Sequence, residues 1–87
     1  MARQRSMEAV LASEFVTIGE LVRLTGARYS TLKFYTEAGM LPFVQPEPRL
    51  TRRYPREAAV AQVAQIRRLR EQGYSIPEIQ QLLAGEP

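Results

Sequence analysis

Cationic, hydroxyl and aromatic side chains gather in one short segment of the chain, residues 28–35. Within two helical turns this segment carries Arg28, Tyr29, Thr31, Lys33 and Tyr35. Arginine and lysine reach phosphates by charge and base edges by donor geometry, while tyrosine and threonine can donate to phosphate. The cluster therefore predicts contact with double-stranded DNA. The alternative is an ordinary amphipathic helix whose aromatic side chains pack inward, and for Phe34 and Tyr35 taken singly that alternative stays open.

A second cationic element follows about twenty residues downstream. It carries Arg49, Arg52 and Arg53, and Tyr54 comes directly after them. Three arginines on a short ribbon cannot all face the small core of a domain of this size, so most of them are expected at the surface. There they would reach backbone phosphates or a minor groove. Tyr54 either donates to a phosphate or packs under the helix that follows, and both interpretations remain open.

Charge is concentrated in the middle third of the sequence. The chain has a formal net charge of +3, but residues 23–56 alone hold seven arginine and lysine residues against two glutamates, a local charge of +5. A polyanion would be attracted to such a region, although an arginine-rich solvated surface would give the same count. We interpret the run Arg67, Arg68 and Arg70 as a solvated face near the end of a helix and not as a contact for a polyanion. Positive charges there interact favourably with the helix dipole.

The composition excludes several classes of chemistry. The 87 residues include no cysteine and no histidine, which removes disulfides, thiolate nucleophiles, Cys/His zinc sites and the commonest general base. The sequence offers no nucleophile–base pair, metal constellation or glycine-rich phosphate loop, so we expect no enzyme, metal or cofactor. No apolar run approaches a membrane span, and we expect a cytoplasmic, nucleoid-associated protein.

Two short helices joined by a tight turn must position the first cluster. Residues 17–20 have the form of a capping box, in which the Thr17 hydroxyl accepts from the amide of Glu20. The same helix N-terminus could also seat a phosphate. Thr25 and Gly26 end this helix, and a second helix is predicted from about Arg28 to Ala38, with Leu32 in the core. This arrangement is typical of a helix-turn-helix.

The rest of the chain predicts a wing and a helical hairpin. Residues 40–55 hold four of the six prolines, which favours a β-hairpin with arms near 43–45 and 49–53 and a tip at 46–48. Helices are predicted from about Pro55 to Gln72 and from a capping box at Ser75. The fold class is therefore mainly α, a winged helix-turn-helix with roughly four helices. Residues 1–14 form an N-terminal extension, either an arm or a short helix, and residues 15–87 form the domain.

The order of these motifs resembles the MerR family of bacterial transcription regulators. The resemblance covers residues 16–84 and is carried by the segments 17–21, 25–26, 31–35, 38–42, 52–54 and 66–79. It implies a domain that binds DNA as a homodimer at a palindromic site and distorts the DNA to regulate a promoter, with RNA polymerase as a further partner. Lys33, Phe34 and Tyr35 fall where the family usually has Arg-Tyr-Tyr. Arg28 falls where a capping serine is common, so the recognition helix is expected to lack a side-chain cap.

The resemblance also leaves alternatives open. Family members usually continue into a coiled-coil helix and an effector domain, neither of which fits within 87 residues. The expectation is therefore either a short form without its own sensor or the DNA-binding part of a longer protein. The first hypothesis is a sequence-specific transcription regulator. The second is an excisionase-like or architectural factor that bends DNA and assembles cooperatively on it. The third is an adaptor that uses its arginines on an acidic protein partner.

Overall fold

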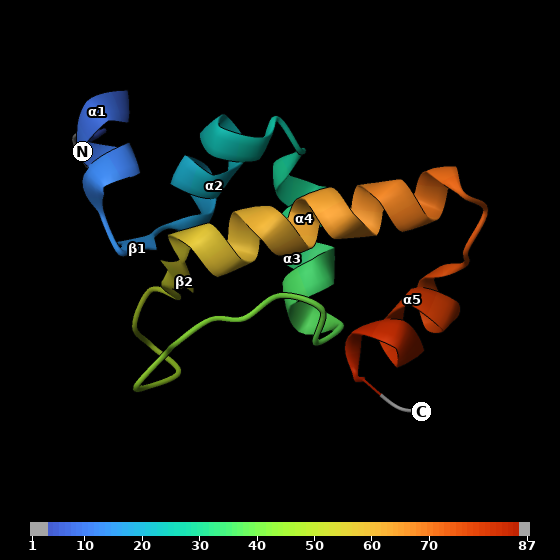
Figure 1. Ribbon diagram of the computed structural model, residues 1–87. Coiled ribbons are helices and arrows are strands. Elements are labelled where there is room, and N and C mark those ends of the chain that lie inside the picture. The colour runs from blue at the N-terminus through green and yellow to red at the C-terminus, as the bar shows by residue number, and fades with distance from the viewer. Residues whose placement is uncertain (1–3, 86–87) are drawn as a thin grey trace.

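The computed structural model describes residues 4–85, and within them it is mainly helical (Figure 1). The first three residues of the expected extension and the last two of the expected domain lie outside the described residues. In chain order the elements are α1 (Met7–Ala12), β1 (Phe15–Val16), α2 (Ile18–Thr25), α3 (Tyr29–Glu37), β2 (Tyr54–Pro55), α4 (Arg56–Glu71) and α5 (Ile76–Leu83). The predicted fold class is confirmed, with α1 as a helix beyond the four expected.

Local capping sets the ends of the helix-turn-helix. The Thr17 hydroxyl accepts from the amide of Glu20 at 3.2 Å, and the Glu20 carboxylate accepts from the amide of Thr17 at 2.9 Å. Gly26 ends α2 with a φ of 74°, a left-handed conformation that costs glycine little. Both features were predicted. A second capping box, between Ser75 and Glu78, begins α5 as expected.

The long helix α4 is the centre of the domain. It crosses in front of α3, with α1 and α2 near its first turns, and α5 folds back below its C-terminal half (Figure 1). Its buried side is formed by Ala59, Val63 and Ile66, as the apolar periodicity predicted. Leu21 of α2, Leu32 of α3 and Ile79 of α5 pack in the same core. The opposite side of α3 is left free, which a recognition helix requires.

The wing differs from its prediction in how its strands pair. Residues 40–53 form a loop closed by one antiparallel bridge between Val44 and Arg53, while the two-stranded ladder pairs β1 with β2. The register of this bridge places Pro46, in the expected tip, opposite Thr51. Proline has no N–H to donate, so the pairing cannot continue normally through Pro46. The Gln45 side chain instead donates to the carbonyls of Pro48 and Leu50 and closes the tip.

The N-terminal extension takes the helical alternative. Ser6 caps α1 by accepting from the amide of Ala9, and Val10 is fully buried in the core. The Arg56 side chain donates to the carbonyl of Ser13 at 2.9 Å, and its amide donates to the carbonyl of Glu14. The described part of the extension is therefore packed against the domain.

Candidate nucleic-acid interface

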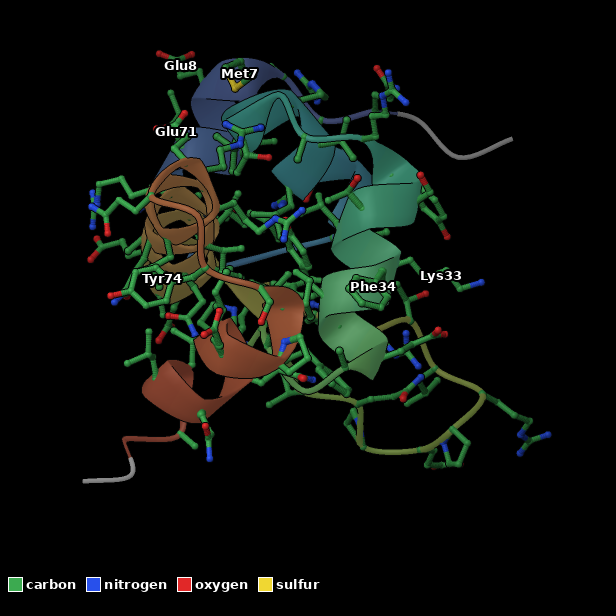
Figure 2. All side chains as sticks on the ribbon, turned by 90° about the vertical axis from the view of Figure 1, so that its right-hand side faces the viewer. Met7, Glu8, Lys33, Phe34, Glu71 and Tyr74 are labelled. Atoms are coloured by element: carbon green, nitrogen blue, oxygen red, sulfur yellow. The ribbon has the colours of Figure 1, made fainter. Side chains whose placement is uncertain are left out.

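The exposed face of α3 carries the first group of predicted contact residues. Arg28 occupies the N-cap position without a side-chain cap, as expected. Tyr29 is 56% exposed, and Lys33 follows one turn later on the surface. Figure 2 shows the Lys33 side chain extending away from the body of the domain, on the side where the wing loop also projects. The α3 surface and the wing therefore face in a common direction.

A hollow of about 380 Å³ separates α3 from the wing. One wall is the α3 face formed by Tyr29, Lys33 and Glu37, which lie four residues apart along the helix. The opposite wall comes from Gln45, Thr51 and Arg52, and the remaining lining residues are Ile18 and Tyr54. With two cations and one anion, this hollow has a net positive charge and several hydrogen-bond donors. It can accept a phosphate or the polar edge of a base.

Arg52 is held on the wing by an aromatic ring. Its guanidinium carbon lies 5.2 Å from the centre of the Phe43 ring, within the range of a cation–π interaction. Its Nε is buried and has no hydrogen-bond partner within residues 4–85. The Phe43 ring therefore holds the guanidinium beside this hollow, and Nε faces the protein, so only the terminal nitrogens of Arg52 could reach a ligand there.

The other wing arginines lie outside that hollow. Arg49 is exposed near the tip of the loop, and Arg53 is exposed at its root. The backbone of Arg53 is fixed by two hydrogen bonds to Val44, of 2.8 and 2.9 Å. Together with Thr17, Thr51 and Arg5, Arg53 lines a second hollow of about 340 Å³. Sequence reasoning missed Arg5, because it lies in the extension, 15 residues before its ion-pair partner Glu20.

The ion pair between Arg5 and Glu20 is a two-pronged contact. Arg5 Nε donates to Glu20 Oε2 and Arg5 Nη2 donates to Glu20 Oε1, both at 2.7 Å. The hydrogen bonds from Arg5, joined by the backbone amide of Thr17, lower the pKa of the Glu20 carboxyl to about 2, despite partial burial that opposes the shift. Glu20 is therefore ionised at neutral pH, and its charge is matched by Arg5.

Tyr54 requires a correction. Its side chain is 0% exposed, and its hydroxyl lies 2.8 Å from the Thr36 hydroxyl. Of the two interpretations that the sequence leaves open, the packing role therefore holds, and donation from the buried Tyr54 hydroxyl to a phosphate does not fit this structure. An aromatic residue at the root of a wing can fill the core. Because a small domain buries little apolar surface, the large area of a buried tyrosine ring contributes much to its stability.

Thr31 and Tyr35 also lie apart from Lys33. They line a different hollow with Arg28 and Arg67, on the side of α3 near its turn with α2. Tyr35 is buried, which fits the alternative that this aromatic side chain packs inward. Arg67 donates to the carbonyl of Thr25 at the end of α2, a structural role like the one assigned to the arginine run. The predicted residues of α3 therefore divide between two faces.

Phe34 is half exposed on the outer side of α3 (Figure 2). Its ring centre lies 6.1 Å from that of Tyr35. Phe34 carries no hydroxyl, so at this position the helix offers apolar contact in place of a hydrogen bond.

Among residues 4–85, no helix has the length and apolarity needed to cross a membrane.

A helix-turn-helix with a free second helix beside an arginine-bearing wing defines a winged helix-turn-helix of the DNA-binding class. The family model described as MerR HTH family regulatory protein matches residues 16–86. The chain therefore belongs to the MerR family, whose members are DNA-binding transcription regulators. The match begins after α1, so Arg5 lies outside it.

Curated relatives support the same assignment. The chain is 41% identical over 68 residues to Nodulation protein NolA of Bradyrhizobium elkanii, which covers 78% of this chain and 31% of that protein. It is 40% identical over 68 residues to Nodulation protein NolA of Bradyrhizobium diazoefficiens, covering 78% of this chain and 28% of that protein. The chain thus spans less than a third of the length of these relatives. No solved structure matches it.

Proposed function

We propose that this chain is the sequence-specific DNA-reading part of a transcription regulator. The observation that carries the proposal is the hollow between α3 and the wing, where Tyr29 and Lys33 face Thr51 and Arg52 across one net positive surface. A B-DNA major groove admits an α-helix, and backbone phosphates border it on both sides. In this arrangement α3 enters the groove while the wing contacts the adjacent backbone.

The proposed contacts differ in what they supply. Lys33 and Tyr29 stand on the exposed face of α3 and reach base edges or phosphates, whereas Arg49, Arg52 and Arg53 of the wing, with Thr17 at the start of α2, bind the backbone. The neighbouring hollow is bordered by Arg28, Thr31 and Tyr35. From there, these residues would contact only the edge of the DNA groove, on the side away from the wing. Base contacts by α3 set the sequence preference, and the wing adds affinity.

We further propose that two copies act together. A single recognition helix reads only a few base pairs, so a homodimer on a palindrome or a cooperative assembly is needed for a unique genomic site. This function places the chain on the nucleoid in the bacterial cytoplasm, within reach of RNA polymerase. An excisionase-like or architectural factor would use the same interface, and an adaptor would direct the same arginines toward an acidic protein.

A salt titration of binding to a labelled duplex separates the DNA functions from the adaptor. A complex that neutralises about five phosphates gives a slope of roughly −4 to −5 in log affinity against log salt. Absence of duplex binding at low salt would rule out both DNA functions. Sequencing of genomic fragments bound by the protein then separates the two, because palindromes at promoters support a regulator while repeated sites at recombination loci support an architectural factor.

Substitutions of the two cations that line the hollow between α3 and the wing test the proposed interface. Lys33→Ala and Arg52→Ala should each weaken duplex binding by about five- to twentyfold and lower the salt slope by roughly one. Both should keep the helical circular dichroism of the parent, since neither side chain belongs to the core. Arg68→Ala, which removes an exposed charge from α4, is the matched control and should bind normally. Unfolding of either variant would show that the faces of α3 and the wing are assigned incorrectly.

A further inference from the structure

The hollow beside the wing root brings the N-terminal segment to the proposed interface. Its volume is about 340 Å³, and its lining residues are Arg5, Phe15, Val16, Thr17, Thr51 and Arg53. Thr51 also lines the hollow between α3 and the wing, so the two hollows adjoin. A segment outside the family match therefore lies next to residues that are proposed to bind DNA.

An acidic group stands directly behind this hollow. The Glu20 carboxylate accepts hydrogen bonds from two of the lining residues, from the amide of Thr17 at 2.9 Å and from the guanidinium of Arg5 at 2.7 Å. The Glu20 side chain is only 11% exposed, so water screens its charge poorly toward the hollow. Without Arg5, that charge would repel a phosphate approaching Arg53.

Arg5 is committed to Glu20 and to the adjacent chain. Besides the two bonds to Glu20, its guanidinium donates to the Ser13 hydroxyl at 2.6 Å and to the Phe15 carbonyl at 3.4 Å. Arg23 in turn donates to the carbonyl of Arg5 at 2.8 Å and fixes its backbone. With most of its donors occupied, Arg5 is poorly suited to bind a phosphate directly. Its effect on the hollow is the charge that it places beside Glu20.

We propose that Arg5 is a positioning residue for DNA binding, which cancels the charge of Glu20 so that a backbone phosphate can enter the hollow beside Arg53. The formal charges of Arg5, Glu20 and Arg53 sum to +1, and loss of Arg5 brings the sum to zero. This inference rests on the proposed DNA-binding function and adds to it a residue from outside the matched family domain.

A double-substitution cycle on duplex affinity tests the proposal. Arg5→Gln should weaken binding by about three- to tenfold at a fixed, moderate salt concentration. Glu20→Gln should bind as tightly as the parent or more tightly, because glutamine keeps the capping box without the charge. The double variant has the parent's net charge and should return to within about twofold of its affinity. Arg5→Lys should also bind nearly normally, since it keeps the charge.

The results of this cycle distinguish an effect of the Arg5 charge on DNA binding from a loss of folded structure. If the double variant binds as weakly as Arg5→Gln, or if Arg5→Gln binds like the parent, the proposed role of Arg5 is refuted. Thermal melts establish that each variant is folded at the assay temperature, and Arg68→Gln controls for the loss of one positive charge elsewhere. A parent protein that binds no duplex would instead overturn the proposed function, so the two failures cannot be confused.

Discussion

Removal of one oxygen atom tests whether Tyr54 belongs to the core. The Thr36 hydroxyl donates its proton to the carbonyl of Leu32 at 2.8 Å, so in the bond between the two hydroxyls Tyr54 is the donor. Tyr54→Phe keeps the ring and deletes this bond. A buried neutral hydrogen bond contributes about 1 kcal/mol, and the loss approaches about 2 kcal/mol because the Thr36 oxygen is left without its donor.

That loss should be visible in a thermal melt. For a domain of this size, each kcal/mol lowers the melting temperature by about 4–8 °C. Tyr54→Phe keeps the ring that borders the hollow and removes only a buried hydroxyl, so the folded variant should bind duplex DNA within about twofold of the parent. Both quantities can be measured on the same sample, by circular dichroism and by fluorescence anisotropy.

Tyr29→Phe is the matched control, because it deletes the same atom from an exposed tyrosine of α3. It should leave the melting temperature unchanged within about 2 °C and weaken duplex binding by a few-fold, as expected for loss of a surface donor. The reasoning would be refuted if Tyr54→Phe lost more than about tenfold in DNA affinity at an unchanged melting temperature. Such a result would mean that the Tyr54 hydroxyl reaches the DNA.

Two further predictions concern the N-terminal extension. The pKa of Glu20 is lowered to about 2 in the folded protein from 4.5, so its contribution to stability is complete above pH 4.5 and declines as the pH falls toward 2. Arg5→Gln should therefore move acid unfolding to higher pH, as followed by ellipticity; an unchanged acid midpoint would argue against the ion pair in solution. Val10→Ala should lower the free energy of unfolding in urea by about 1–3 kcal/mol, whereas Leu11→Ala, at a 51% exposed neighbour, should cost much less. Equal effects would mean that α1 is not packed as described.

The parts of the fold that follow from neighbouring residues were predictable from sequence. Each capping box joins residues three apart, and Gly26 ends α2 through its own φ angle. Such interactions depend on backbone geometry within one turn, so residue type and spacing determine them. The apolar stripe of α4 was found for the same reason. Thr31 and Lys33 are two residues apart, and residues at that spacing lie on roughly opposite faces of an α-helix. The sequence therefore already implied that these two side chains would face different hollows.

The parts that depend on distant partners were not predictable in the same way. The ladder joins Phe15 to Pro55 across forty residues, and the pairing of a strand with one of several possible neighbours is decided by packing. Arg5 and Glu20 form a contact that no local pattern encodes. The sequence signal that did exist was the spacing of Met7, Val10 and Leu11, which indicated a helix in the extension but not where it would pack.

The corrected role of Tyr54 also explains how the wing is supported. The Tyr54 ring lies 6.3 Å from the ring of Phe43, and the Phe43 ring carries the Arg52 guanidinium at 5.2 Å. On its other side, the Tyr54 hydroxyl meets Thr36 of α3. Three contacts, from Thr36 to Tyr54, from Tyr54 to Phe43 and from Phe43 to Arg52, thus connect α3 to the wing arginine. Because this support comes mainly from the rings, Tyr54→Phe can weaken the fold and still leave Arg52 in place. A residue that first suggested a phosphate contact therefore supports the proposed DNA interface from within the core.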